Sequence, residues 1–452
     1  MRKTILLALA AGLLGSAAPA ATLRVPSQYA TINAALDAAV AGDSVLVAPG
    51  VYSQYETRLN PDGAWISSVA FVKAGVVLCS EGGPSVTTLT MTSTAPHSAP
   101  RIVYRYPLSG PEFVLVGFTF TGNTLVCLRC VELLAAQVGD GIARIEDCEV
   151  HDYGTGNDCE ASMIVSVNLT MRRCRFHDMN ANGGAFVHAA GSLLIEDCEF
   201  TNCRSGAARA VEGGPVTVRR TRFTDDVQTN GAGGACYTDT RTTALFEDCW
   251  FEGNQSLYGG GAGASGGALA LWGSQSDETV RNCTFVENYT NVQGEGGAII
   301  ASGHLIVIEG NTFFGNAQAQ AATRAGASIT VESGTVTLRR NVIAASSGDT
   351  AVGLYQGTIH SSCNVFWQNV LGNADGFTLD PTDIEADPWF CDTAANDFTV
   401  NAASPCLPGN GNPSCTELIG AWGQGCGVVS VEPSTWGRIK NSFRSGSEEK
   451  KR

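Results

Sequence analysis

One eight-residue pattern recurs through the middle of the chain and limits the folds that are open to it. Its form is apolar–x–apolar–x–x–small–x–apolar, the sixth residue is usually Cys, Thr or Asn, and successive copies start 23 to 34 residues apart. The copies run from FVLVGFTF (113–120) to VTLRRNVI (336–343), and the register of a tenth near SSCNVF (361–366) is ambiguous. Alternation on both sides of a two-residue break predicts two short strands joined by a bend.

Such a unit cannot bury its apolar side alone, so it must stack on its neighbours. The lengths of the units, with no helical periodicity between the strands, fit successive coils of a parallel β-helix about 4.8 Å apart. Leucine-rich repeats need a regular leucine pattern, and propeller blades need four strands per 40 or more residues. The predicted class is therefore all-β, a single-stranded parallel β-helix with a helix over its N-terminal end.

The charges at the break alternate from one copy to the next. The first break position reverses sign seven times in succession, through Glu146, Arg172, Glu196, Arg219, Glu247, Arg281, Glu309 and Arg339. In a register of one copy per coil, each charge lies between opposite charges, which stabilises the stack, and a slip by one coil would bring like charges together. We therefore interpret this column as setting the register, with ligand recognition as the alternative.

The small residue of the pattern forms an inward column of mainly cysteine, from Cys148 to Asn341. Residues on a straight column cannot easily surround one ion tetrahedrally, so we interpret these thiols as structural and assign no metal ligands.

The two ends of the chain differ from this body. Residues 1–20 carry Arg2 and Lys3, then an apolar run, then APA, as a cleaved signal peptide does, so we expect a secreted or cell-surface protein. Residues 21–426 form the β-helix with its cap and a C-terminal segment, and 427–452 form a tail of different composition. A net charge of −15 argues against nucleic acid as a partner. No segment of the sequence predicts a membrane span.

The segment PSQYATINAALDAAVAGDSVLVAPGVY (26–52) predicts an amphipathic helix near residues 30–40 that leads into a strand. It resembles the opening of exported bacterial right-handed β-helix proteins of the pectin lyase-like superfamily, in which such a helix caps the first coil. Repeated Phe-x-x-Asn and Gly-Gly-Ala motifs, at residues such as Phe251/Asn254 and 266–268, resemble the repeats of polymorphic outer membrane proteins. The resemblance implies a right-handed helix and a surface or carbohydrate partner.

The segment from Asp387 onward is similar to the closing segment of such exported proteins. Its loops carry Cys391, Cys406, Cys415 and Cys426, which in an oxidising compartment predict two disulfides of unassigned connectivity.

The superfamily includes lyases and glycoside hydrolases, but their motifs are not intact here. Arg-Ile-Lys occurs only in the tail, at 438–440, and the companion motifs of polygalacturonases are absent from the sequence. The one candidate catalytic group is Asp152, Asp178 and Asp225, which follow the pattern on separate coils. Stacked carboxylates about 5 Å apart would couple, as acid–base catalysis requires, or bind Ca²⁺. The alternative is that these residues only satisfy the backbone of a turn.

Four further residues are candidate ligand-binding groups. His151 and His177 precede two of the aspartates, and Trp272 and Trp367 could stack on sugar rings, although packing explains such aromatics equally well. The predicted function is a secreted or cell-surface module that binds polysaccharide or a cell-surface glycan, or has a structural role. The alternative is a polysaccharide lyase or glycoside hydrolase, with Ca²⁺ as the cofactor of the lyase and no other cofactor assigned.

Overall fold

The structure is a computed structural model, which describes most of the chain from residue 19 onward. The described residues are 19–91, 100–122, 129–137, 140–152, 163–180, 186–188, 190–204, 206–210, 214–229, 231–239, 243–257, 265–273, 275, 277–291, 295–319 and 325–427. The predicted signal peptide and tail therefore lie almost wholly outside them and stay predictions. No helix in these ranges is long and apolar enough to cross a membrane.

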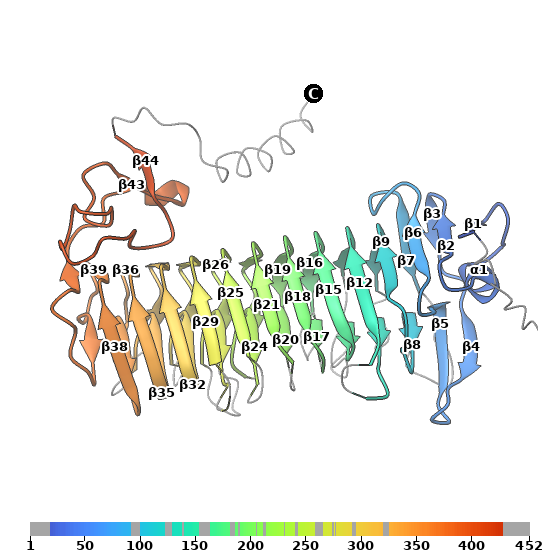
Figure 1. The fold of residues 1–452 in the computed structure, drawn as a ribbon, viewed down its shortest axis with the longest axis horizontal. Coiled ribbons are helices and arrows are strands. Elements are labelled where there is room, and N and C mark those ends of the chain that lie inside the picture. Colours follow the sequence, from blue (N-terminus) through green and yellow to red (C-terminus); the bar gives the residue numbers. More distant parts are fainter. Residues whose placement is uncertain are drawn as a thin grey trace, which may run out of the picture.

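The described chain winds into one long parallel β-helix, as the repeat predicts (Figure 1). A 24-stranded sheet, sheet A, forms two of its faces, and a 13-stranded sheet, sheet B, forms the third. We call the two strand rows of sheet A row A1 and row A2. In the frame of the sequence repeat, row A2 holds the first half of each copy and sheet B the second half.

Row A2 contains β1 (Thr22–Val25), β2 (Ser44–Val47), β6 (Val77–Ser80), β9 (Phe113–Val116), β12 (Ile142–Glu146), β15 (Asn168–Arg172), β18 (Leu193–Glu196), β21 (Val216–Arg219), β25 (Ala244–Glu247), β29 (Asp277–Arg281), the second halves of β32 (Ile299–Glu309) and β35 (Ile329–Arg339), and β38 (Thr358–Ser362).

Row A1 contains β5 (Trp65–Phe71), β8 (Arg101–Arg105), β11 (Arg129–Leu133), β14 (Met163–Val165), β17 (Phe186–His188), β20 (Ala208–Ala210), β24 (Cys236–Thr238), β28 (Leu269–Leu271), the first halves of β32 and β35, β37 (Val352–Leu354) and β40 (Ala374–Asp375). One antiparallel strand, β4 (Glu56–Leu59), pairs with β5.

Sheet B contains β3 (Gly50–Tyr52), β7 (Thr87–Thr90), β10 (Thr119–Thr121), β13 (Glu149–His151), β16 (Arg175–Met179), β19 (Glu199–Cys203), β22 (Arg222–Thr224), β26 (Trp250–Glu252), β30 (Thr284–Val286), β33 (Thr312–Phe314), β36 (Val342–Ala344), β39 (Val365–Trp367) and β41 (Ile384–Glu385). A short third sheet follows it, made of β23 (Val227–Gln228), β27 (Gln255–Ser256), β31 (Tyr289–Thr290) and β34 (Ala317–Gln318).

The predicted helix closes the N-terminal end of the core. It is α1 (Ile32–Ala38), and the Thr31 hydroxyl caps it by accepting a hydrogen bond from the Ala34 amide at 3.1 Å. Ile32, Ala35 and Leu36 are buried against the first coils. The cap removes the apolar end of the core from water, which an open solenoid end would expose.

The charge column has the predicted register. Arg172 pairs with Glu196, and Glu196 with Arg219, through directly opposed residues of β15, β18 and β21. The Glu196 carboxylate accepts hydrogen bonds from Arg172 Nε at 2.7 Å and from Arg219 Nε at 2.6 Å. Burial alone would raise the pKa of Glu196, but hydrogen bonds from Arg220, Arg219 and Arg172 lower it to about 2. The alternation is therefore a ladder of ion pairs within the protein.

The second break position has a conformation that the sequence pattern does not show. It is left-handed in every described copy from Gly117 to Arg340, and in the tenth copy Cys363 occupies it with φ 54°. The inward column continues from Asn341 to Asn364, which settles the register of SSCNVF. Non-glycine residues at positive φ are strained, and the packed coils on either side hold them there.

Two columns fill the core beneath sheet B. Phenylalanine rings stack from Phe176 through Phe200, Phe223, Phe251 and Phe285 to Phe313, with centroids 4.7 to 5.0 Å apart. The asparagines of the Phe-x-x-Asn motif form a buried ladder, in which Asn254 and Asn288 each donate from Nδ2 to Oδ1 of the next asparagine at 2.9 and 3.0 Å. These motifs are thus coil-stacking devices, whichever family they resemble.

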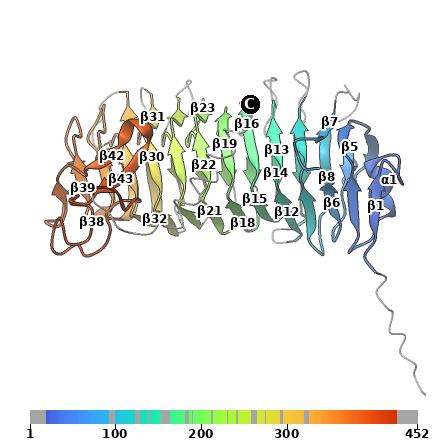
Figure 2. The ribbon, with the colours of Figure 1, turned by 90° about the horizontal axis from the view of Figure 1, so that it is seen from above.

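The C-terminal segment folds back over the outer surface of sheet B (Figures 1 and 2). It comprises β42 (Phe390–Asp392), the short 3₁₀ helix η1 (Thr393–Ala395), β43 (Asp397–Asn401) and β44 (Gln424–Cys426). Phe398 packs against Trp250 and Phe314, with ring centroids 6.0 and 5.3 Å apart. Trp422 Nε1 donates to Thr284 Oγ1 at 2.8 Å.

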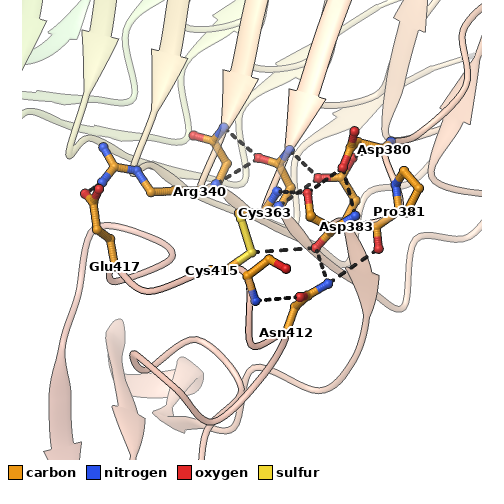
Figure 3. The surroundings of a disulfide bond; sticks show 12 residues. Arg340, Cys363, Asp380, Pro381, Asp383, Asn412, Cys415 and Glu417 are labelled. Carbon is orange, nitrogen blue, oxygen red and sulfur yellow. Dashed lines mark hydrogen bonds and ion pairs between the residues drawn. A yellow bond between two sulfur atoms is a disulfide. The ribbon is translucent and has the colours of Figure 1, made fainter.

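Two disulfides hold this segment, but one differs from the prediction. Cys391 pairs with Cys426, whereas Cys415 pairs with Cys363 of the last coil (Figure 3). Cys406 is a buried free thiol, so the expectation that it pairs within the segment was wrong. The physical reason is the register of the tenth copy: because Asn364 takes the inward position, Cys363 points outward and meets the loop that carries Cys415.

Candidate functional site

The three predicted aspartates lie at one corner of the helix: Asp152 and Asp225 directly follow β13 and β22 of sheet B, and Asp178 is the last but one residue of β16. Asp152, Asp178 and Asp225 all have φ between 55° and 58°, the left-handed conformation that Asp and Asn tolerate best. The side chains of all three are exposed. Asp152 and Asp178 are on adjacent coils, but Asn202 occupies the coil between Asp178 and Asp225. The fold therefore brings together two of the three carboxylates.

The histidines join these aspartates as expected. His151 and His177 stack with ring centroids 4.9 Å apart, and each Nδ1 contacts the adjacent aspartate, at 2.8 Å for Asp152 and 3.0 Å for Asp178. The hydrogen bonds from His177 and Asn202 lower the pKa of Asp178. A carboxylate held in its charged form is suited to accept hydrogen bonds and unsuited to donate a proton.

No metal site is visible in the described residues, where no three His, Cys, Asp or Glu side chains are grouped to hold an ion. Asp158 and Glu160, two further carboxylates shortly after Asp152 in the sequence, lie outside those residues. The Ca²⁺ prediction therefore stays a prediction.

The two candidate tryptophans lie on different faces. Trp367 is half-buried on β39, where it packs against the cluster of Val342, Val365 and Cys406 beneath the C-terminal segment. Trp272 follows β28 on the outer surface of row A1, where its ring meets Tyr237 edge-on at 5.4 Å. Trp272 is also half-buried, and with Tyr237 it packs against Ala232, Ala270 and Ile300. Trp272 is therefore the candidate on the outer surface of row A1, whereas Trp367 lies beneath the C-terminal segment.

Trp272 is part of an aromatic ledge, which we define as Arg209, Tyr237 and Trp272. The Arg209 guanidinium lies over the Tyr237 ring, 4.9 Å from its centroid. Arg209 and Tyr237 face outward on β20 and β24 and are directly opposed in the register. The ledge presents aromatic surface with a cation at one end.

A cleft begins beside this ledge on the next coil. Leu271 pairs with Ala301, and Trp272 and Ser302 are the residues that follow this pair on adjacent coils. The cleft has a volume of about 410 Å³ and is lined by Glu295, Ser302, Glu332, Ser333, Tyr355 and Gln356. We call these six residues the row A1 cleft.

The polar groups of the row A1 cleft are hydrogen-bonded or partly desolvated. The Ser302 and Ser333 hydroxyls are 3.0 Å apart. Burial raises the pKa of Glu295, an effect that a hydrogen bond from Tyr355 reduces and the nearby Glu332 increases. Burial and the hydrogen bond to Glu295 raise the pKa of Tyr355 to about 12, so its hydroxyl stays a donor. The cleft combines hydroxyl donors with two carboxylates.

A buried carboxyl lies at the corner behind Trp272. Glu278 is 1% exposed and its Oε1 accepts a hydrogen bond from Thr238 Oγ1 at 2.6 Å, while its Oε2 has no partner in the described structure. Burial raises the pKa of Glu278 to about 7, although hydrogen bonds from Thr238 and the Gly273 backbone lower it. A Cβ at Gly273 would come within 2.9 Å of this carboxyl, so the glycine lets the corner close over it.

Sequence reasoning missed both Glu278 and the row A1 cleft. The sequence does mark Glu278, because in ETVRNCTF (278–285) it occupies the first inward position, which is apolar in every other copy between residues 113 and 343. No sequence pattern marks the residues of the row A1 cleft. Its residues come from three successive coils and from loops between the recognisable copies.

The chain matches a family model described as a right handed beta helix region over residues 117–285. This match confirms the expected handedness of the helix. Metabotropic glutamate receptor-like protein R of Dictyostelium discoideum is 27% identical over 160 residues, which are 35% of this chain and 9% of that protein. The chain thus spans less than a tenth of the length of this curated relative.

Several solved structures are similar at low identity. A rhamnogalacturonan lyase is 12% identical with a TM-score of 0.42, over 93% of this chain and 98% of that one. Pectate lyase Pel9A is 12% identical with a TM-score of 0.40, over 90% and 97% of the two chains. The alginate lyase AlyGC is 14% identical with a TM-score of 0.40, over 92% of this chain and 60% of that one. At these scores we carry no activity from them to this chain.

Proposed function

We propose that this protein is an exported β-helix that binds a carbohydrate along the outer surface of row A1. The observation that carries the proposal is that the aromatic ledge and the row A1 cleft lie on successive coils, where Trp272 and Ser302 directly follow the paired Leu271 and Ala301. Carbohydrate sites combine aromatic rings, which pack on the apolar face of a sugar, with nearby hydrogen-bonding groups that fix its orientation. The aromatic ledge supplies the rings, and the row A1 cleft supplies the hydrogen-bonding groups.

The charge of the cleft limits the ligand. Its lining, all within the described residues, contains Glu295 and Glu332 and no Lys or Arg. A polyuronate would place carboxylates beside these two groups and be repelled. We therefore expect a neutral or amino-bearing glycan to bind better than pectin or alginate.

Replacing Trp272 by Ala should weaken binding to such a glycan about tenfold, because a lost stacking contact of roughly 1.4 kcal/mol corresponds to that factor. Titration calorimetry against neutral, amino-bearing and acidic oligosaccharides would measure the change. Trp389→Ala is the matched control, since Trp389 is exposed on the C-terminal segment, at 47%. Equal losses in the two variants, or preferential binding of polyuronates, would contradict the proposal.

A second candidate function, glycoside hydrolysis, is favoured by one observation. Glu295 has a raised pKa beside a second carboxylate, as the general acid of such an enzyme does. New reducing ends that disappear in Glu295→Gln and persist in Asp178→Ala would place hydrolysis in the row A1 cleft. Unsaturated products that require Ca²⁺ and disappear in Asp178→Ala would instead support a lyase at the His–Asp corner.

A further inference from the structure

A separate pocket lies at the N-terminal end of the helix, far along the stack from the row A1 cleft. It has a volume of about 190 Å³, and its lining includes Arg58, Asn60, Phe71, Lys73, Tyr104 and Arg105. Its lining residues come from the β4–β5 hairpin and from β8 with the residues that follow it. Figure 1 shows these strands at the N-terminal end of the helix. At about 30 Å³ per water, the volume equals roughly six waters, close to that of one sugar ring.

The pocket contains an amide donor without an acceptor. Asn60 is 8% exposed, and its Nδ2 has no hydrogen-bond partner in the described structure. Backbone hydrogen bonds hold the residue in place: the Asn60 backbone N–H donates to the Ala64 carbonyl at 2.7 Å, and the Asn60 backbone carbonyl accepts from the Gly63 N–H at 2.9 Å. A buried unpaired donor costs free energy, and a ligand oxygen would remove that cost.

The Tyr104 hydroxyl is close to this amide. Burial, with smaller effects from Glu132 and Asp62, raises the pKa of Tyr104 to about 12, while Asn60 lowers it. Asn60 is thus near enough to influence the hydroxyl, although its Nδ2 forms no hydrogen bond of acceptable geometry. The hydroxyl stays protonated and is a second donor at the pocket.

Three cations gather here in a chain whose net charge is −15. Arg58 is already paired with Asp37 and Glu56, and it lies over the Phe71 ring at 4.5 Å. The Lys73 ammonium donates to the carbonyls of Asp37 and Ala39, at 2.8 and 3.2 Å, which do not neutralise its charge. Arg105 is exposed at the rim and donates from Nε to the Pro107 carbonyl at 3.0 Å.

We propose that this pocket binds a small organic acid of monosaccharide size, with its carboxylate directed at Asn60 and Arg105 and its body against the aromatic rings. The unpaired amide requires an acceptor, and the charges of Arg105 and Lys73 favour an anion. Glu132 and Asp62 near Tyr104, with Asp37 and Glu56 beside Arg58, are the opposing charges, which limit the preference to one carboxylate. The rings of Phe71, Tyr104 and Tyr106 provide the apolar wall.

The test is titration calorimetry of the full chain with D-glucuronate, and with D-glucose as the ligand that lacks the carboxylate. Glucuronate should bind, and glucose should bind at least tenfold more weakly. Arg105→Gln and Asn60→Asp should each weaken glucuronate binding at least tenfold. Arg24→Gln, which removes an exposed arginine of β1, is the matched control and should bind as the parent protein does.

Arg105→Gln keeps the test decisive if Asn60→Asp does not fold, because Arg105 is exposed. Equal binding of the two sugars, no binding of either, or full binding by Arg105→Gln would overturn the proposal. If inorganic sulfate displaces glucuronate and glucuronate and glucose bind with equal affinity, the pocket is a general anion site, which would also overturn the proposal. Trp272→Ala should leave this binding unchanged, which separates this proposal from that for the row A1 cleft.

Discussion

At the scale of single residues, Glu278 is the group whose position is hardest to explain by packing alone. Its row A2 neighbours above and below are Ala244 and Ile306, so a carboxyl replaces an apolar side chain in the core. Its folded-state pKa of about 7 exceeds the ordinary value of 4.5, so the folded state binds a proton that the unfolded state has lost between these values. The contribution of protonated Glu278 to the free energy of unfolding should therefore be fully present below pH 4.5 and be lost as the pH rises through 7.

Glu278→Gln should remove this pH dependence. At pH 8 the variant should be more stable than the parent by about 3 kcal/mol, since a shift of roughly 2.5 units corresponds to that free energy. At pH 4 the two should be nearly equal. Urea unfolding at both pH values would measure the difference, with Glu81→Gln on the surface as the control. A difference in stability between parent and variant that is the same at pH 4 and pH 8 would contradict the burial of this carboxyl.

The candidate site shows why residue-scale prediction is limited. Asp152, Asp178 and Asp225 were found because carboxylates in register suggest chemistry, but the left-handed corner selects the same residue types, as Asn202 and Gly253 show. One sequence pattern therefore has two physical causes. The polar residues of the row A1 cleft could not be predicted, because neither their coils nor their loops carry a common pattern.

At the scale of elements, the ion-pair ladder makes the strands of row A2 depend on one another. Glu196 is buried between arginines of β15 and β21, whereas Glu199 pairs on the surface with Arg175 at 3.0 Å. Removing one partner of a buried pair leaves the others without compensation and is strongly destabilising. Exposed ion pairs such as Glu199 with Arg175 contribute little to the free energy of unfolding.

Glu196→Gln should destabilise the protein by about 2 to 4 kcal/mol at pH 7, and the matched variant Glu199→Gln by less than about 1 kcal/mol. The folded-state pKa of Glu196 is depressed, so its contribution is complete above 4.5 and is lost as the pH falls towards 2. The difference in free energy of unfolding between the parent and Glu196→Gln should therefore become smaller as the pH falls from 4.5 to 2. Denaturant unfolding from pH 2 to pH 7 would show this, and a constant gap would contradict it.

The element register was largely predictable because inward apolar positions, break charges and the small column all repeat together. The tenth copy was the exception, since Cys363 and Asn364 each suit the small column. Only the stacked structure decides between them, because Asn364 continues the inward small-residue column through hydrogen bonds with Asn341 and Asp383.

At the scale of the whole molecule, the C-terminal segment completes sheet B. The outward residues of this sheet are charged or polar from β7 to β22 and then include Trp250, Phe314 and Trp367, which Phe390, Phe398 and Cys406 cover. The sequence could not predict this cover, because it joins residues more than 70 apart along the chain without a local pattern. Sheet B therefore depends on the segment for its solubility.

A chain that ends at Ala386 and carries Cys363→Ser should expose this apolar surface. We expect it to bind a hydrophobic dye strongly and to aggregate, which light scattering would detect, because uncovered patches of this kind promote association. A chain that ends at Gly427 removes only the tail and is the matched control, with the parent's behaviour expected. Identical behaviour of the two shortened chains would show that the cover is dispensable.

The alternating charges of row A2 also restrict how the length of this solenoid can change during evolution. Since acidic and basic coils take turns, loss or duplication of one coil would join two like coils, such as Arg172 with Arg219 if the coil of Glu196 were deleted. Gain or loss of two coils would preserve every pairing. Viable length variants of this part of the molecule should therefore differ by even numbers of coils.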